Sequence, residues 1–193
     1  MININRIKGI LTAPQKEWTV IENEHTPHAK LFMEYVLPLS LIPAIAAFIG
    51  YGLLGYSAFG VHIHSMSLGI RQAILQWISM AGGVYLTAFV INALAESFGA
   101  KKDFDRAFSL VAYSYTPWLI GGIFYILPSL AILAFLAALY GLYILYLGMQ
   151  PMMKAPTERN TGYFIVSLLA LIVVSAIISV VLGAILISSS LFM

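Results

Sequence analysis

Residues 107–149 read AFSLVAYSYTPWLIGGIFYILPSLAILAFLAALYGLYILYLGM, and none of these 43 residues is Asp, Glu, Lys or Arg. A helix needs roughly 20 residues to cross a hydrocarbon core about 30 Å thick, because it rises about 1.5 Å per residue. The stretch is therefore long enough for two membrane-spanning helices. It divides at Leu127-Pro128-Ser129, since proline lacks the N–H that would continue a helix and favours a turn.

Three further apolar runs complete the membrane-spanning part of the sequence, namely Leu31–Leu54, Gln72–Phe98 and Tyr163–Ile187. Each is longer than one span requires, and none alternates apolar with polar side chains, which favours helices over the strands of a β-barrel. Hydrophobic residues make up 61% of the chain and charged residues 9%, whereas a soluble domain is about half apolar and about a quarter charged. The sequence predicts an all-α fold, a polytopic transmembrane bundle of five helices.

The orientation of this bundle follows from the positions of the ten Lys and Arg residues. If the N-terminus is cytoplasmic, nine of the ten fall in cytoplasmic segments and only Arg71 falls outside. Segments rich in Lys and Arg stay on the cytoplasmic side of a membrane. We therefore expect a multi-pass membrane protein, surrounded by membrane lipids, with its N-terminus in the cytoplasm and its C-terminus outside. The net charge of +2 is too small to indicate binding to nucleic acid.

Residues 1–30 precede the first span and are expected to form a cytoplasmic amphipathic segment, while residues 31–193 form the membrane domain. Apolar residues recur there at helical spacing, at Ile4, Ile7, Ile10 and Leu11. Two interpretations of this short helix are open. It lies on the anionic surface of the membrane, or it packs under the bundle.

A second short helix is expected to carry Trp18 and Ile21. Residues Thr12–Gln15 fit a capping box, in which the threonine and glutamine side chains satisfy free N–H groups at the start of a helix. Pro14 falls early in the first turn, where its missing N–H is not needed. The sequence therefore predicts a helix start at this point.

The sequence offers no recognisable catalytic centre. It contains no Cys, no paired carboxylates at membrane depth and no His after His64, so the usual nucleophile–base pairs of intramembrane hydrolases are missing. We expect a protein that is not an enzyme and uses no cofactor. His62 and His64 could offer two imidazoles to a metal ion, but no Asp, Glu or Cys lies nearby in the sequence to complete the ligand set. No metal site is predicted.

Polar residues on the second and third spans form the candidate site. Tyr85, Asn92 and Glu96 share one face of the second helix, and Tyr113 and Ser114 lie on the third. Polar groups at membrane depth face protein or water. One interpretation is a polar cleft open to the cytoplasm, and we predict on this basis that Glu96 points into the bundle. The other is that Glu96 reaches the headgroups and pairs with nearby cations, while Asn92 bonds to a neighbouring helix.

Pro117 is expected to bend the third helix between Tyr113 and Gly121, because its ring and its missing N–H disturb the helical hydrogen bond to the carbonyl of Tyr113. The pair Gly121-Gly122 follows one turn later. Two adjacent glycines permit close contact with a neighbouring helix.

Three motifs together resemble the Yip1-domain family of membrane proteins, in its bacterial branch. They are Pro14-x-x-x-Trp18-x-x-Ile21, the stretch from Tyr113 to Pro117, and Tyr143-x-x-Tyr146-Leu147-Gly148. The resemblance covers nearly the whole chain and implies five spans with a cytoplasmic N-terminus. Eukaryotic relatives act in vesicle traffic and bind small GTPases and other membrane proteins. They carry an Asp-Leu-Tyr-Gly-Pro-like stretch before the first span, from which residues 32–38 of this chain depart.

The function implied by this resemblance is a non-enzymatic inner-membrane protein of the Yip1 type. Such a protein would organise membrane or bind partner membrane proteins, or itself. The alternative is a transporter, channel or lipid-binding membrane protein that uses the cytoplasm-facing polar cleft.

Overall fold

The computed structural model describes residues 3–58, 61–63 and 65–190. Within these residues, five helical segments are long and apolar enough to cross a membrane. They are His28–Leu54, Met66–Leu94, Phe104–Ile126, Ala131–Met153 and Thr157–Ile177. The predicted five-helix bundle is confirmed, and the break that separates the third and fourth spans falls at the predicted proline.

The first span contains two π-helical turns. It consists of α3 (His28–Leu31), η1 (Phe32–Val36), α4 (Leu37–Ala47) and η2 (Phe48–Leu54). Pro38 lies in the first turn of α4. In a regular α-helix its ring would clash with the carbonyl of Glu34, and the wider π-helical turn of η1 gives the ring more room. A β-hairpin that the sequence did not predict follows, with β1 (Tyr56–Ala58) antiparallel to β2 (Val61–Ile63).

The second and third spans meet in a short connection. Helix α5 (Met66–Leu94) is followed by the 3-10 turn η3 (Glu96–Phe98), and Gly99 ends it at φ 70°. The third span is α6 (Phe104–Ser114), α7 (Thr116–Gly121) and η4 (Gly122–Ile126). Its regular helix is interrupted at Tyr115, two residues before Pro117. Pro117 lies in the first turn of α7, where an N–H would have no helical partner.

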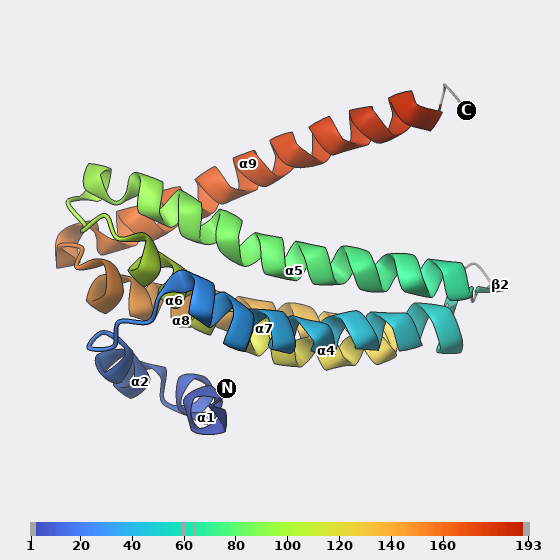
Figure 1. Cartoon of the computed structure of the whole chain (residues 1–193), viewed down its shortest axis with the longest axis horizontal. Helices are drawn as coiled ribbons and strands as arrows, with labels where there is room; N and C mark the ends of the chain where they lie inside the picture. Colours follow the sequence, from blue (N-terminus) through green and yellow to red (C-terminus); the bar gives the residue numbers. More distant parts are fainter. Residues whose placement is uncertain (1–2, 59–60, 64, 191–193) are drawn as a thin grey trace.

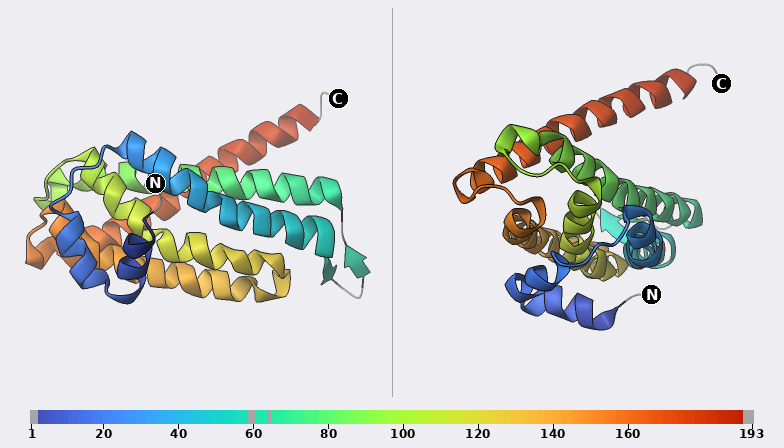
Figure 2. Two further views of the ribbon diagram at one scale, coloured as in Figure 1. Left: turned by 60° about the horizontal axis from the view of Figure 1, so that its bottom comes forward. Right: turned by 60° about the vertical axis from the view of Figure 1, so that its left-hand side comes forward.

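The fourth and fifth spans are long single helices. After η5 (Pro128–Leu130) come α8 (Ala131–Met153) and α9 (Thr157–Ser190). Helices α4, α5, α7 and α8 run side by side, whereas α9 diverges from them towards the C-terminus (Figures 1 and 2). Tyr163 holds the N-terminal part of α9 against the end of the second span. Its hydroxyl donates to the carbonyl of Ile91, and its ring stacks on Phe98 with ring centroids 5.2 Å apart.

The glycine pair after Pro117 lies between two helices. A Cβ on Gly121 would lie 2.5 Å from the Cβ of Ala137 in α8, and one on Gly122 would lie 3.0 Å from the Cα of Pro43 in α4. The first distance is shorter than real Cβ contacts allow, and the Cβ on Gly122 would lie closer still to the Cβ of Pro43. The predicted close helix contact is therefore confirmed, and it is made on both sides of the third span.

The charged residues gather at one end of the bundle. We call this the charged end and define it as residues 3–30, 95–106 and 153–159. It contains the N-terminal helices α1 (Ile4–Thr12) and α2 (Pro14–Ile21) and the α5–α6 and α8–α9 connections (Figure 1). Nine of the ten Lys and Arg residues belong to it, while Arg71 lies in the second turn of α5, which follows the β-hairpin.

Candidate functional site

Residues from all three family-like motifs meet at the charged end. The Trp18 side chain is buried, and its Nε1 donates to the carbonyl of Ile144 in α8 at 3.1 Å. The ring lies in a notch made by Gly148, where an added Cβ would lie 2.6 Å from Trp18 Cζ2 and 2.7 Å from Leu110 Cδ1. The edge of Tyr113 faces the same indole, with ring centroids 6.4 Å apart. Trp18, Tyr113 and Gly148 therefore form one joint between α2, α6 and α8.

A charged network lies next to this joint. Arg6 Nη1 binds Glu17 Oε1 at 2.6 Å, and its Nη2 binds Glu24. The guanidinium also lies over the Tyr113 ring, 5.7 Å from its centroid. Because only 10% of the Arg6 side chain is exposed, water screens these interactions less than at an open surface.

The interruption of the third span is stabilised from the first span. The hydroxyl of Tyr35 lies 2.7 Å from Thr116 Oγ1, one residue before Pro117. The Tyr35 ring also packs edge-on against Tyr113 at 5.1 Å. These two contacts of Tyr35 therefore connect the first span to the third span next to Pro117.

The two N-terminal helices pack against the bundle. Ile10, Trp18 and Ile21 are buried, which favours the second of the two interpretations left open by the sequence. Figure 2 shows both helices lying across one side of the charged end. Ile4 at the start of α1 remains exposed.

The predicted capping box is wrong. Thr12 is the last residue of α1, and its hydroxyl donates to the carbonyl of Lys8 at 2.7 Å. Ala13 is the N-cap residue of α2 and offers no side-chain hydrogen bond. Pro14 does begin α2 as predicted, so the proline alone marks the helix start.

Tyr146 of the third motif contacts α9 and is not part of the Trp18 joint. Its hydroxyl lies 3.2 Å from Thr161 Oγ1, and its ring meets Phe164 edge-on at 5.3 Å. Tyr146 therefore holds the N-terminal part of α9 against α8.

The prediction that Glu96 points into the bundle is wrong. Helix α5 ends at Leu94, and Glu96 starts the 3-10 turn with 72% of its side chain exposed. Its Oε2 lies 3.9 Å from Lys102 Nζ. A carboxylate at the edge of the hydrocarbon is more stable in water beside a cation than buried in the bundle.

The other polar residues of the second span do not form a cleft with Glu96. The Tyr85 ring packs on Phe32 and on Phe108, each with ring centroids 4.8 Å apart. Asn92 has a buried Oδ1 for which no hydrogen-bond partner is present among the described residues. The predicted cleft is therefore filled by aromatic packing between the first three spans.

Tyr113 and Ser114 lie on other sides of the third span. Tyr113 faces Arg6 and Trp18, as described above. Ser114 is buried at the contact with α8, where a Cβ on Gly141 would lie 2.7 Å from the Ser114 carbonyl oxygen. Four of the five predicted cleft residues therefore take part in four different contacts, and the fifth, Asn92, has a buried Oδ1 without a hydrogen-bond partner among the described residues.

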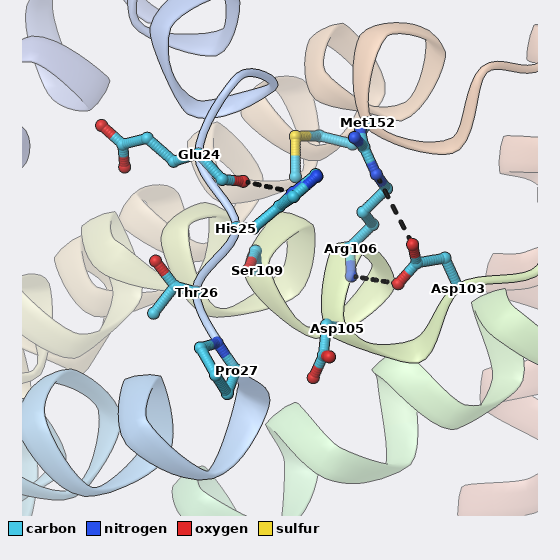
Figure 3. Close-up of a pocket in the computed structure, with 9 residues that line it drawn as sticks. All are labelled: Glu24, His25, Thr26, Pro27, Asp103, Asp105, Arg106, Ser109 and Met152. Atoms are coloured by element: carbon cyan, nitrogen blue, oxygen red, sulfur yellow. Dashed lines mark hydrogen bonds and ion pairs between the residues drawn. The ribbon is translucent and has the colours of Figure 1, made fainter.

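A pocket of about 270 Å³ opens between the segment before the first span and the start of α6 (Figure 3). We call it the Arg106 pocket. His25 and Thr26 line one side, Arg106 and Ser109 of α6 the other, and Met152 comes from α8. Sequence reasoning missed this site. The available signal was that Arg106 is the last charged residue before the long apolar stretch.

Of the two histidines considered as metal ligands, only the backbone of His62 is described, as part of β2. His64 and the side chain of His62 lie outside the described residues. In the part of the chain that the structure does describe, there is no group of three His, Asp or Glu side chains that could hold a metal ion.

Five apolar spans whose connecting charges gather mainly at one end define a polytopic integral membrane protein. The chain belongs to the Yip1 domain family, whose model matches residues 8–192. It is similar to the inner membrane protein YohC of Escherichia coli K12 and to YohC of E. coli O6:H1, each 26% identical over 127 residues. These matches cover 65% of this chain, and the chain spans 65% of the length of these curated relatives. No solved structure matches the chain.

Proposed function

We propose that this chain is a non-enzymatic protein of the inner membrane that binds a partner membrane protein, or a second copy of itself, through its charged end. Its family and its similarity to an inner membrane protein support the location. The absence from the sequence of a nucleophile paired with a base supports a binding role rather than catalysis.

The observation that carries this proposal is a surface on which two tyrosines of α8 lie beside the link between the N-terminal helices. We call it the Tyr143 surface. It consists of Thr12–Lys16, Tyr140 and Tyr143, and it encloses a shallow pocket of about 340 Å³. Tyr143 is 50% exposed and stacks on Tyr140 with centroids 6.0 Å apart. The hydroxyl of Tyr140 donates to the carbonyl of Leu11 at 2.8 Å. Exposed tyrosine on a rigid support is typical of residues that dominate binding energy at interfaces.

The alternative of transport through a polar cleft has less support. Tyr85, Asn92 and Glu96 do not converge. Helices α5 and α6 pack against each other, and Val84 of α5 and Val111 of α6 are buried in the same apolar core. A channel or carrier in this bundle would need a route other than the predicted cleft.

The orientation is tested by single cysteines. We expect Ser57→Cys and Ser190→Cys to react with a membrane-impermeant thiol reagent added to intact cells, because nine of ten cations lie on the other side. Lys102→Cys is expected to react only after the membrane is permeabilised. The chain has no native Cys, so each signal reports one position. Strong labelling of Lys102→Cys in intact cells would reverse the orientation.

Partner binding is tested by photo-crosslinking in cells. A photoreactive residue at Lys16 or Tyr143, on the Tyr143 surface, is expected to yield a discrete adduct with one integral membrane protein or with a second copy of the chain. The matched control is Leu136, which lies two turns away on the same helix and is equally exposed but is not part of the Tyr143 surface. We expect it to yield at least tenfold less protein adduct. Equal protein adducts at all three positions would contradict the proposal.

A further inference from the structure

Arg106 is a buried cation whose hydrogen bonds are incomplete. Only 15% of its side chain is exposed, and its Nη1 is buried without a hydrogen-bond partner among the described residues. Its Nε lies 3.6 Å from Asp103 Oδ2, which is an ion pair but too long for a hydrogen bond. A guanidinium has five N–H donors. Most of the donors of Arg106 are therefore available to another acceptor.

The Arg106 pocket has the size and the donors for a small anion. Its volume of about 270 Å³ is several times the roughly 30 Å³ that one water molecule occupies in the liquid. Figure 3 shows the His25 ring next to the Arg106 guanidinium, with Ser109 of α6 below the ring. The hydroxyls of Ser109 and Thr26 add neutral donors.

Three carboxylates also line the pocket, and each is already paired. Glu24 turns away in Figure 3 and binds Arg6 on the far side of its segment. Asp105 points away from the guanidinium and accepts from the backbone N–H of His28 at 2.8 Å, with Nδ1 of the same residue 2.6 Å away. The third carboxylate belongs to the N-cap residue of α6 and pairs with the guanidinium itself. The unsatisfied group of this pocket among the described residues is therefore a cationic donor, and its charge favours an anionic acceptor.

We propose that the Arg106 pocket binds a phosphate group, with Arg106 as the principal ligand and His25 and Ser109 beside it. A planar guanidinium fits two phosphate oxygens at once. The pocket lies where the first and third spans begin, at His28 and Phe104, which is the depth of lipid headgroups. The phosphate therefore comes from a phospholipid headgroup or from a free phosphate compound in the cytoplasm. This site is separate from the Tyr143 surface and goes beyond the partner-binding proposal.

The experiment has two arms on the purified full-length protein. In the first arm, radiolabelled inorganic phosphate is titrated against the protein in a detergent without phosphate. In the second, phospholipid retained through purification is counted by native mass spectrometry. Arg106→Gln is expected to weaken binding at least tenfold in one of the arms. Arg159→Gln removes an exposed cation of the same charged end and is expected to change binding less than twofold.

His25→Glu keeps the test decisive if Arg106→Gln does not fold. His25 is exposed, so the fold tolerates the change, but the new carboxylate repels phosphate and is expected to weaken binding at least fivefold. Asn23→Glu adds the same charge two residues away and serves as its control. Loss in the first arm identifies free phosphate, and loss in the second arm alone identifies a headgroup. Absence of wild-type binding in both arms, or equal effects of variants and controls, would overturn the proposal.

Discussion

Replacing Trp18 by Ala is expected to lower the free energy of unfolding by about 3–5 kcal/mol, the usual range for removing a large buried aromatic side chain. The change removes the bond from Nε1 to the Ile144 carbonyl and the contact with Tyr113. It also leaves the α2 helix without its main anchor. We expect a cysteine placed at buried Ile21 to react with a thiol reagent much faster in this variant, and the stability loss to appear in thermal denaturation in detergent.

The matched control is Val20→Ala, because Val20 is the neighbouring α2 residue but is 51% exposed. Val20→Ala is expected to change the free energy of unfolding by less than about 0.5 kcal/mol. A double-mutant cycle then tests the notch directly. Gly148→Ala brings a Cβ against the Trp18 ring, so its cost should fall by at least about 1 kcal/mol when Trp18 is already Ala. An equal cost of Gly148→Ala in both backgrounds would show that the notch does not hold the ring.

Gly122→Leu is expected to lower the free energy of unfolding by about 3 kcal/mol or more, because it overpacks a tight helix contact. A Cβ at this position would lie 3.0 Å from the Cα and 3.2 Å from the Cγ of Pro43. Proline cannot rotate its side chain away, so α4 and the third span must separate. The measurement is the fraction of protein that remains monodisperse in detergent after heating.

Gly82→Leu is the matched control for this substitution. Gly82 lies within α5 and is exposed, and a Cβ there would meet no atom within 4 Å. The control makes the same chemical change and replaces a poor helix former by a good one. We expect its stability to equal or slightly exceed that of the wild type. A comparable loss in Gly82→Leu and Gly122→Leu would show that close packing at Gly122 is not the cause.

The local sequence was sufficient for the features that depend on one segment at a time. The uncharged stretch 107–149 predicted two spans and the break at Pro128. It was sufficient because a hydrocarbon core demands uncharged helical segments of a set length, whichever neighbours they meet. Pro14 was placed correctly at the start of α2 for a similar reason, since a proline constrains the backbone in any context.

Two local predictions failed because each assumed the wrong element boundary. The face shared by Tyr85, Asn92 and Glu96 requires α5 to continue through Glu96, but the helix ends at Leu94 and the following turn changes the direction of the side chain. Thr12 matched a capping box, yet α1 extends through that residue. A short motif does not show where a helix ends when the preceding helix competes for the same residue.

The arrangement of the helices required the folded chain. Nothing in the local pattern shows that Trp18 meets Gly148 or that Arg106 faces His25, because these pairs join segments far apart in the sequence. Lipid is as apolar as leucine, so apolarity alone does not select which helices touch in a membrane. Shape and hydrogen bonding select them, through a notch at Gly148, a flat contact at Gly121-Gly122 and the bond between Tyr35 and Thr116. These contacts, and the pocket that they leave beside Arg106, exist only once the spans have packed.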